Sequence, residues 1–429
     1  MSDDGPKTPA ASPPEGSPPG LGRPGAPSGV SVLRSTSTIR ERCQNILRAV
    51  DEGRSRHFTL HRSQLDEVAR RVERVTRQNY PELRIPYHSR WRHFEAGGVN
   101  RKAELDARLA GRDAAAQARA RIDLTLVSVL LDAGAGPHWG YAEASSGERF
   151  TRSEGLGVAS FRAFMQGCFS SDAGDPLRVD AQALARIDAA TLAEVFQVRD
   201  GNPLVGLEGR ATLLQRLGET LLSQADVFGA EGRPGRLFDA LTAQGDRLPA
   251  MRVLQALLDH LSPIWLTGSS LAGVPLGDCW PHPLAGGSGL TAGWVPFHKL
   301  SQWLTYSLLE PFEWAGITLT ELDGLTGLPE YRNGGLLLDA RVIVPKDPTF
   351  AARTHTASDE AIVEWRALTV ALIDEIAPLV RARLNKKPEE MPLACILEGG
   401  TWAAGREIAK SLREGGSPPL HIESDGTVF

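Results

Sequence analysis

Cysteine is scarce in this chain of 429 residues, and no two cysteines form a CxxC pair. The four are Cys43, Cys168, Cys279 and Cys395. Such wide spacing does not fit a disulfide scaffold or a zinc ribbon, and it indicates a reduced, cytoplasmic protein. No apolar run is long enough to span a membrane, and the N-terminus lacks the apolar segment of a secretory signal. We therefore expect no membrane association.

Basic residues are not in excess either, because 47 Lys and Arg stand against 52 Asp and Glu, for a net charge of -5. This balance argues against a general nucleic-acid binder. Several catalytic motifs are also missing. There is no HExxH or similar metal-ligand pattern, no Walker A lysine follows Gly400, and residues 286–289 lack the spacing of a serine nucleophile elbow. We expect no metal site.

Residues 1–33 are rich in Pro, Gly, Ser and Ala. Such a segment cannot bury enough apolar surface to offset its ordering entropy, so we expect a disordered tail. A polyproline docking ligand is the alternative. Residues 34–429 contain no internal repeat and no long polar linker, which predicts a single large domain.

Helical periodicity dominates this domain. Apolar spacing predicts a first helix from the capping residues 35–38 to Val50 and a second over 65–77. A long helix is predicted over 101–132, with a second half apolar enough to enter the core. Further helices, separated by Gly or Pro, are predicted over 154–168, 180–197, 208–225, 234–245, 250–262, 298–314, 357–384 and 401–413. With one strand candidate, 335–344, the sequence predicts a mainly α fold with a minor β element.

The segment 325–335 has an unusual composition, because Glu330, Tyr331 and Arg332 are adjacent and two glycines follow. A loop that binds a small polar ligand needs an acceptor, a planar surface and a fixed donor fork, which these three side chains supply. The glycines would let the backbone approach a ligand closely. The alternative is that Glu330 and Arg332 pair with other charges at a surface corner, and we favour the binding loop.

A second such segment spans 131–143. Asp132 ends the predicted apolar helix, where a carboxylate meets the unfavourable end of the helix dipole and must be offset by another group. Asp132 is therefore either a site residue or a helix-end residue beside a glycine cap. Trp139 and Tyr141 offer stacking surfaces to a ligand, and core packing is an equal alternative for both.

A third segment, 84–101, is basic and aromatic and contains His88, Arg90 and Arg92. Guanidinium forks bind oxyanions bidentately, so this segment could bind a phosphate or carboxylate of a ligand. A solvated face with structural ion pairs is the alternative. The spacing of His88 and His93 does not place both on one helical face for a metal.

Glu154, Asn202 and Glu398 each stand beside glycine just before a predicted helix. N-capping of that helix is the favoured interpretation of each. Together they still suggest loops that gather at one end of a helical body.

These segments resemble, in matching order, the uracil catabolism protein 4 family of the URC pyrimidine-degradation pathway. The resemblance covers about residues 33–429, and the segments that carry it are 87–94, 131–136, 152–156, 201–210, 325–339 and 398–402. Residues 326–332 are also similar to the acidic-Tyr-Arg segment of queuosine salvage nucleoside glycosylases, which are akin to helical DNA glycosylases. The acidic residue there is Asp, whereas this chain has Glu330.

The resemblance implies a helical DNA-glycosylase-like fold, a nucleoside- or nucleotide-derived substrate and no cofactor. The implied reaction cleaves the bond between urea nitrogen and ribose in a ribosylurea-type compound. A carboxylate beside the anomeric carbon stabilises positive charge on the sugar or activates water, and the poor leaving group needs a proton donor. Glu330 and Asp132 could share these roles.

Substrate binding would fall to residues of the same segments. Tyr331 or Trp139 could hold the planar leaving group, and Arg332 with Arg90 and Arg92 could bind a 5′-phosphate. The other predicted binding residues are His88, Tyr141, Glu154 and Asn202.

Two other functions stay open. One is an amidohydrolase that acts on the ureide, which the missing metal and nucleophile motifs weaken. The other is a non-catalytic helical protein that binds a pathway intermediate or scaffolds partner enzymes. Asp132, Glu330 and Arg332 around one cavity would favour an enzyme, whereas carboxylates scattered over the surface would favour the binding protein.

Overall fold

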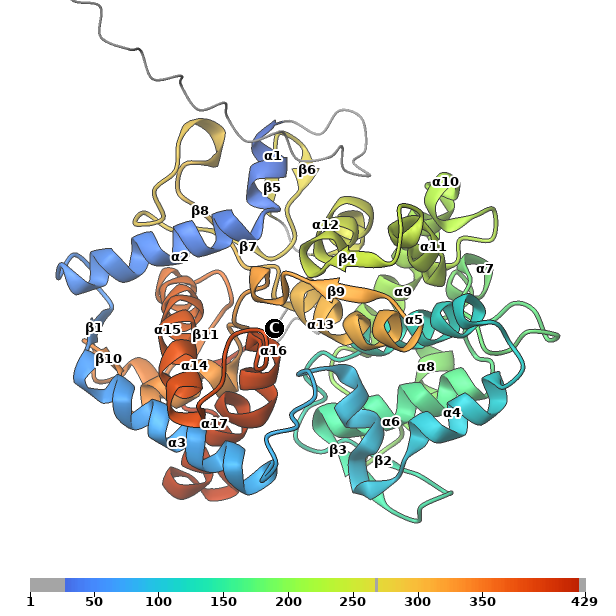
Figure 1. Cartoon of the computed structure of the whole chain (residues 1–429), viewed down its shortest axis with the longest axis horizontal. Helices are drawn as coiled ribbons and strands as arrows, with labels where there is room; N and C mark the ends of the chain where they lie inside the picture. Colours follow the sequence, from blue (N-terminus) through green and yellow to red (C-terminus); the bar gives the residue numbers. More distant parts are fainter. Residues whose placement is uncertain (1–27, 267–268, 424–429) are drawn as a thin grey trace, which may run out of the picture.

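The computed structural model describes residues 28–266 and 269–423, and helices dominate this part of the chain (Figure 1). The predicted mainly α fold with a minor β element is confirmed. The α-helices are α1 (Ser28–Leu33), α2 (Thr36–Asp51), α3 (Leu65–Asn79), α4 (Arg101–Leu109), α5 (Ala114–Leu130), α6 (Arg152–Met165), α7 (Ala181–Leu184), α8 (Ala189–Val195), α9 (Leu207–Leu222), α10 (Ala225–Phe228), α11 (Leu237–Thr242), α12 (Ala250–Leu261), α13 (Lys299–Trp314), α14 (Tyr331–Asp339), α15 (Glu360–Leu384), α16 (Leu393–Ile396) and α17 (Trp402–Leu412). Two further segments position the site, the 3-10 segment η2 (Arg90–Gly98) and the π-helical segment η8 (Leu397–Thr401).

The strands are two or three residues long and occur in two-stranded pairs within the described residues. The pairs β1–β10, β2–β3, β5–β6 and β7–β8 are antiparallel, and β4–β9 and β11–β12 are parallel. Their bounds are β1 (Phe58–Leu60), β2 (Gly140–Ala142), β3 (Arg149–Thr151), β4 (Arg247–Pro249), β5 (Ser270–Leu271), β6 (Val274–Pro275), β7 (Cys279–Pro281), β8 (Trp294–Pro296), β9 (Thr318–Thr320), β10 (Ile343–Pro345), β11 (Thr354–His355) and β12 (His421–Ile422). Isolated two-stranded pairs are at best marginally stable, so the helices supply the core.

Helix α15 is the central helix of one half of the fold and packs against α2 and α3. Residues 361–373 of α15 are buried all round, which is the property of a core helix. The predicted helices at 35–50 and 65–77 are confirmed as α2 and α3, and their spaced apolar residues face the core. Figure 1 shows α2 and α3, in blue, beside α15 and α17, in red, so segments from opposite ends of the chain pack together.

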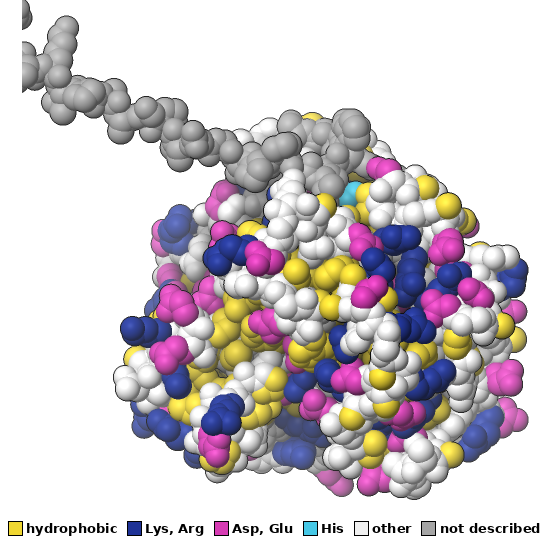
Figure 2. Space-filling model, turned by 45° about the vertical axis from the view of Figure 1, so that its right-hand side comes forward, with side chains coloured by type: hydrophobic (Ala, Val, Ile, Leu, Met, Phe, Trp, Pro, Cys, Tyr) yellow, Lys and Arg dark blue, Asp and Glu magenta, His cyan; other side chains and the backbone are white. Residues whose placement is uncertain are grey.

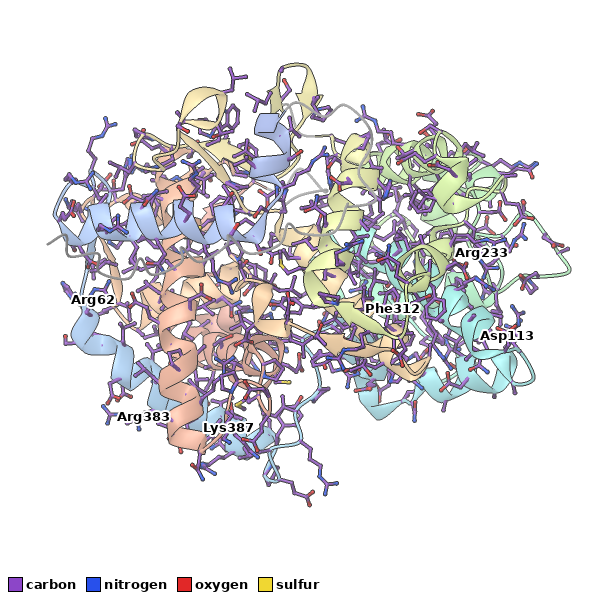
Figure 3. All side chains as sticks on the ribbon, turned by 45° about the horizontal axis from the view of Figure 1, so that its top comes forward. Arg62, Asp113, Arg233, Phe312, Arg383 and Lys387 are labelled. Carbon is purple, nitrogen blue, oxygen red and sulfur yellow. The ribbon has the colours of Figure 1, made fainter. Side chains whose placement is uncertain are left out.

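The other half of the fold surrounds α5, which is buried continuously over residues 120–130 and packs against α6 and α13. Helix α13 also contacts α12. Phe312 on α13, labelled in Figure 3, is fully buried and stacks on Phe238 with ring centroids 5.5 Å apart. Helix α13 therefore connects the α5 group to the rest of the core.

The prediction of one long helix over 101–132 is wrong in one respect, because this segment contains two helices, α4 and α5. Gly111 has a φ of +87°, which an L side chain rarely adopts, and Asp113 then starts the next helix. The Asp113 carboxylate accepts from the N–H of Ala116 at 2.7 Å, as an N-cap does. Figure 3 labels Asp113 at this turn.

Other predicted helices differ less. Residues 180–197 are divided into α7 and α8, 208–225 contains α9 and the start of α10, and 234–245 contains the short α11. The helices predicted over 154–168, 250–262, 298–314, 357–384 and 401–413 are confirmed, with ends that differ by a few residues.

The strand predicted over 335–344 is wrong for most of its length. Residues 331–339 form helix α14, and only Ile343–Pro345 form a strand, β10, which pairs with β1. The run of three leucines after Gly335 has no clear period, and a short apolar run does not distinguish a strand from a buried helix.

Order begins earlier than the sequence predicted. Residues 1–27 of the predicted tail lie outside the described residues, but its last six residues form α1. Val30 and Leu33 of α1 are fully buried and pack in a small cluster with Cys279.

The surface carries many ion pairs, and Figure 2 shows dark blue and magenta side chains interspersed over one face. Arg62 pairs with Asp51 and Glu375, and Arg383 pairs with Asp66. Both arginines are labelled in Figure 3 near the ends of helices. Among the described residues, no helix combines the length and the apolar composition needed to cross a membrane.

Candidate functional site

A cavity of about 390 Å³ lies where the two halves of the fold meet. Its walls come from η2, the segment after α5, the start of α6, and helices α13, α14, α15 and α17. The polar or charged lining residues are His88, His93, Asp132, Arg152, Ser153, Lys299, Glu330, Tyr331 and Arg332. The aromatic walls are Trp303, Trp365, Trp402 and Tyr331. Asp132, Glu330 and Arg332, which the sequence singled out, therefore share one cavity.

Glu330 is the N-cap of α14 as well as a lining residue. One carboxylate oxygen accepts from the N–H of Arg332 at 2.7 Å, and the other accepts from the N–H of Asn333 at 2.6 Å. Burial raises the pKa of the Glu330 carboxyl, although the two backbone bonds and the nearby side chains of His88 and Lys299 act to lower it. Because each oxygen keeps a second lone pair, the cap orients the carboxylate and leaves it able to accept a proton.

Asp132 follows the end of α5 and is offset there by Arg90, as the dipole argument required. The Arg90 guanidinium is fully buried, and its Nη1 donates to Asp132 Oδ1 at 2.8 Å. Arg90 Nε donates to Ser128 Oγ at 2.7 Å. The Arg90 guanidinium is thus bonded within the protein interior, and it holds Asp132 at the cavity wall.

Arg90 also fixes the tautomer of His93. Arg90 Nη1 lies 3.0 Å from His93 Nδ1, and because a guanidinium only donates, Nδ1 must accept. Burial, followed by the charge of Arg90, lowers the pKa of His93 well below its ordinary value. His93 is therefore a neutral imidazole that carries its proton on Nε2.

The two glycines of α14 make room for neighbouring side chains. A Cβ on Gly334 would lie 2.3 Å from the indole of Trp365, and a Cβ on Gly335 would lie 3.1 Å from Pro419. Trp365 Nε1 also donates to the Gly334 carbonyl at 3.2 Å. The glycines admit Trp365 and Pro419, which line the cavity themselves, so they shape the cavity wall, and neither glycine is itself a lining residue.

Arg332 lines the cavity and is held from several sides. Its Nη1 donates to the carbonyl of Gly416 at 2.9 Å, and its guanidinium lies over the ring of Tyr331. Helix α17 touches the Arg332 backbone so closely that a Cβ on Gly405 would lie 2.2 Å from the carbonyl oxygen of Arg332. The position of Arg332 thus depends on the packing of α14 against α17.

Lys299 and Arg152 add positive charge to the cavity. Lys299 begins α13, and burial lowers its pKa, followed by the charge of Arg366, while Asp278, Glu330 and Asp132 oppose that shift. Arg152 begins α6 with a φ of +54°. Since Arg90 already offsets Asp132, the remaining charge of the lining is positive.

His88 is a lining residue whose Nδ1 lies 2.8 Å from Glu398 Oε2. Glu398 lies inside the π-helical segment η8, so it is not the N-cap that the sequence favoured for it. Glu154 is not an N-cap either, because α6 begins at Arg152 and Thr151 precedes it. Glu154 pairs with Arg406 at 3.4 Å, outside the lining.

The other predicted site residues lie away from the cavity lining. Trp139 is buried and donates from Nε1 to the carbonyl of Phe196 at 2.9 Å. Tyr141 is buried in β2. Asn202 accepts from the N–H of Gly140 and donates to its carbonyl, which fixes that backbone. Arg92 pairs with Glu310 at 2.8 Å.

Sequence reasoning did not assign a site role to several lining residues, namely His93, Arg152, Lys299, Trp303, Trp365 and Trp402. Lys299 and Trp303 lie four residues apart on α13, so they share one face of that helix. Trp402 stands two positions after Gly400 of η8, and this nearby glycine pair is a local sequence signal for it. Within residues 28–266 and 269–423, no three His, Cys, Asp or Glu side chains are grouped to hold a metal ion.

Comparison with known proteins gives two kinds of match. Residues 32–429 match the family described as "Protein of unknown function (DUF1688)". The chain is 38% identical over 436 residues to "Uracil catabolism protein 4" of Lachancea kluyveri, covering 93% of this chain and 99% of that protein. It is 41% identical over 411 residues to "Protein urg3" of Schizosaccharomyces pombe, with the same two coverages. These matches confirm the family resemblance inferred from the sequence motifs.

Proposed function

The chain belongs to the family described as protein of unknown function (DUF1688), and on this premise we propose that it acts in uracil catabolism as a hydrolase of an N-ribosyl bond. The proposed substrate is a ribosylurea-type compound, and the products are urea and ribose, or ribose phosphate if the substrate is phosphorylated. The pathway is suggested by the name of the Lachancea kluyveri relative.

The observation that carries the reaction is the meeting of Asp132, Glu330 and Arg332 at one cavity with aromatic walls. These residues come from segments about 200 positions apart in the chain. A concave site with few polar groups and apolar walls is the usual form of a small-molecule site.

Glu330 is the carboxylate we assign to the anomeric carbon. Cleavage moves the electron pair of the C1′–N bond onto nitrogen and leaves positive charge on the sugar. The Glu330 carboxylate, oriented by its two backbone bonds, stabilises this charge or takes the proton of the attacking water. Asp132 is held in its ion pair with Arg90, which suits it to a supporting electrostatic role at the cavity wall.

The charge of the cavity favours an anionic substrate. Lys299, Arg152 and Arg332 outnumber Glu330, since Asp132 is offset by Arg90. A 5′-phosphate would supply the missing negative charge, so we propose the phosphorylated form as the better substrate. Arg90 and Arg92 are engaged by Asp132 and Glu310, so they are not the phosphate ligands in this proposal.

The test uses purified protein incubated with ribosylurea and, separately, with its 5′-phosphate, while released urea and reducing sugar are measured. Glu330→Gln is compared with wild type, because the amide keeps one cap acceptor but cannot act as a base. Asp188→Asn is the matched control, since Asp188 also caps a helix, α8, through the N–H of Thr191 and does not line the cavity.

Release of both products by wild type and by Asp188→Asn, with loss in Glu330→Gln, supports the hydrolase. Binding of the compounds without any release, measured by calorimetry, would instead support the non-catalytic binding protein. Release of ammonia in place of urea would support an amidohydrolase that acts on the ureide.

A further inference from the structure

The π-helical segment η8 interrupts the helical run between α16 and α17. Such π segments are rare and are frequent at functional sites. A Cβ on Gly400 would lie 2.4 Å from the Val72 side chain and 3.0 Å from its carbonyl oxygen, so glycine is needed where η8 packs against α3. This close contact on one side fixes the segment that carries Glu398 toward η2.

Glu398 and His88 form a hydrogen-bonded pair at the edge of the cavity. His88 Nδ1 lies 2.8 Å from Glu398 Oε2, and the Tyr80 hydroxyl donates to the other oxygen of Glu398 at 3.3 Å. The N–H of His88 donates to the carbonyl of Ala394 at 3.1 Å, which fixes the backbone as well. Because a carboxylate accepts, Nδ1 is the donor, and Nε2 remains for the cavity that His88 lines.

Two carboxylates lie near the imidazole of His88. Glu398 faces His88 from η8, and Glu330 is close enough for His88 to favour its ionised form. Among the described residues, His93 of η2 and Tyr80 are further titratable neighbours of this pair, and neither adds charge in its neutral form. The ring of Trp402 lies beside His88 with centroids 6.4 Å apart.

We propose that His88 is the general acid of the reaction and that Glu398 is its positioning residue, an inference that rests on the proposed N-ribosyl hydrolysis. As the C1′–N bond breaks, its electron pair moves to the urea nitrogen, and the Nε2 proton of His88 transfers to that nitrogen. Water adds to C1′ and gives its proton to Glu330. Neutral His88 keeps its Nδ1 proton, which still bonds Glu398, and regains the Nε2 proton from solvent. Glu330 releases the proton of the attacking water to solvent, so each turnover consumes one water and no net proton.

A leaving-group comparison tests this assignment. His88→Gln and Glu398→Gln are assayed on ribosylurea phosphate and on nicotinamide riboside phosphate, whose pyridinium leaving group departs neutral and needs no proton. His57→Gln is the matched control, because His57 also pairs with a glutamate, Glu360, at 3.0 Å but does not line the cavity. Thermal unfolding checks that each variant is folded.

We expect His88→Gln to lose about 100- to 10,000-fold in kcat/KM on the urea compound and only a few-fold on the pyridinium compound. Glu398→Gln should show the same selectivity with a smaller loss, and His57→Gln should match wild type. If nicotinamide riboside phosphate is not cleaved, the pH profile on the urea compound replaces it. The fall of kcat/KM at alkaline pH that wild type shows should then be absent in His88→Gln.

Equal losses of kcat/KM on both substrates, or an alkaline limb of the pH profile that persists in His88→Gln, would overturn the general-acid assignment. If wild type still releases urea in that case, the proposed function stands. Wild type that releases no urea would overturn the proposed function, and the general-acid role with it. The two failures are therefore distinguishable.

Discussion

Arg90 and Asp132 form an ion pair in which the guanidinium is fully buried and the carboxylate reaches the cavity wall, with 2.8 Å between Nη1 and Oδ1. The same Nη1 contacts His93 Nδ1 and the carbonyl of Ser153. One buried cation thus connects the end of α5, the segment η2 and the start of α6. These are three of the elements that form the cavity.

Arg90→Met should destabilise the protein by about 3–5 kcal/mol, because it leaves Asp132 at the dipole-unfavourable end of α5 without its counter-charge. Urea unfolding measures this change. In a double-mutant cycle, the variant that combines Arg90→Met with Asp132→Asn should lose less free energy of unfolding than the two single variants lose in total. Arg62→Met is the control. The Arg62 side chain is 43% exposed, so loss of its ion pairs should lower the free energy of unfolding by under about 1 kcal/mol. A strictly additive cycle would contradict the coupling.

Gly334→Ala and Gly335→Ala should differ sharply although they are neighbours in α14. At Gly334 the new methyl would meet the rigid indole of Trp365 at 2.3 Å, so we expect a loss of about 1–3 kcal/mol. At Gly335 it would meet the edge of Pro419 at 3.1 Å, and the gain in helix propensity, up to about 1 kcal/mol, should offset this contact. Chemical unfolding of both variants checks the difference, and equal effects would show that the Trp365 contact does not restrict position 334.

Much of the fold could be predicted because α2 and α3 carry apolar residues at strict helical spacing. Helix α14 could not, since its two glycines lower helix propensity and its leucine run has no period. The Glu330 cap starts the helix locally. A contact that is not local, the packing of Gly334 on Trp365, then holds it against the core. Tertiary contacts of this kind override local propensity.

For the site, Glu330 and Arg332 could be predicted because adjacent polar residues of different types are unusual in a connecting loop. Lys299 and Trp303 could not, because each is a single residue on an ordinary helix and only the packing of α13 brings it to the cavity. Asn202 shows the converse, since an amide suited to a ligand instead bonds the backbone of Gly140. Residue type alone does not separate the two uses.

Lys299→Met should discriminate between the two forms of the proposed substrate. If Lys299 binds the phosphate, KM for the 5′-phosphate compound should rise by about tenfold or more, since a charged hydrogen bond contributes about 1.5–3 kcal/mol. KM for unphosphorylated ribosylurea should change little. Lys346→Met serves as the control, because Lys346 Nζ bonds the carbonyl of Ser55 and does not line the cavity. An equal rise of KM for both compounds would argue against a phosphate contact.

Glu143 gives a prediction on pH, because it is buried among cations beside the site segments. Its oxygens accept from Arg101 Nε at 2.8 Å, Arg162 Nε at 2.6 Å and Ser146 Oγ at 2.7 Å. Burial alone would raise the pKa of this carboxyl, but the hydrogen bonds from Arg101, Ser146 and Arg162 outweigh it and lower the pKa from 4.5 to about 2. Burial dominates at Glu310, and it raises that pKa from 4.5 to about 7.

These two shifts have opposite consequences for stability. The lowered pKa of Glu143 stabilises the fold by about 3 kcal/mol above pH 4.5, and this is lost as pH falls toward 2. The free energy of unfolding of Glu143→Gln should therefore lie below that of wild type by about this amount at pH 7, and the gap should narrow by pH 3. For Glu310 the wild type should lose stability relative to Glu310→Gln as pH rises from 4.5 to 7. Urea unfolding of the three proteins across this range checks both trends, and a gap for Glu143→Gln that is independent of pH would assign its effect to packing of the amide, not to charge.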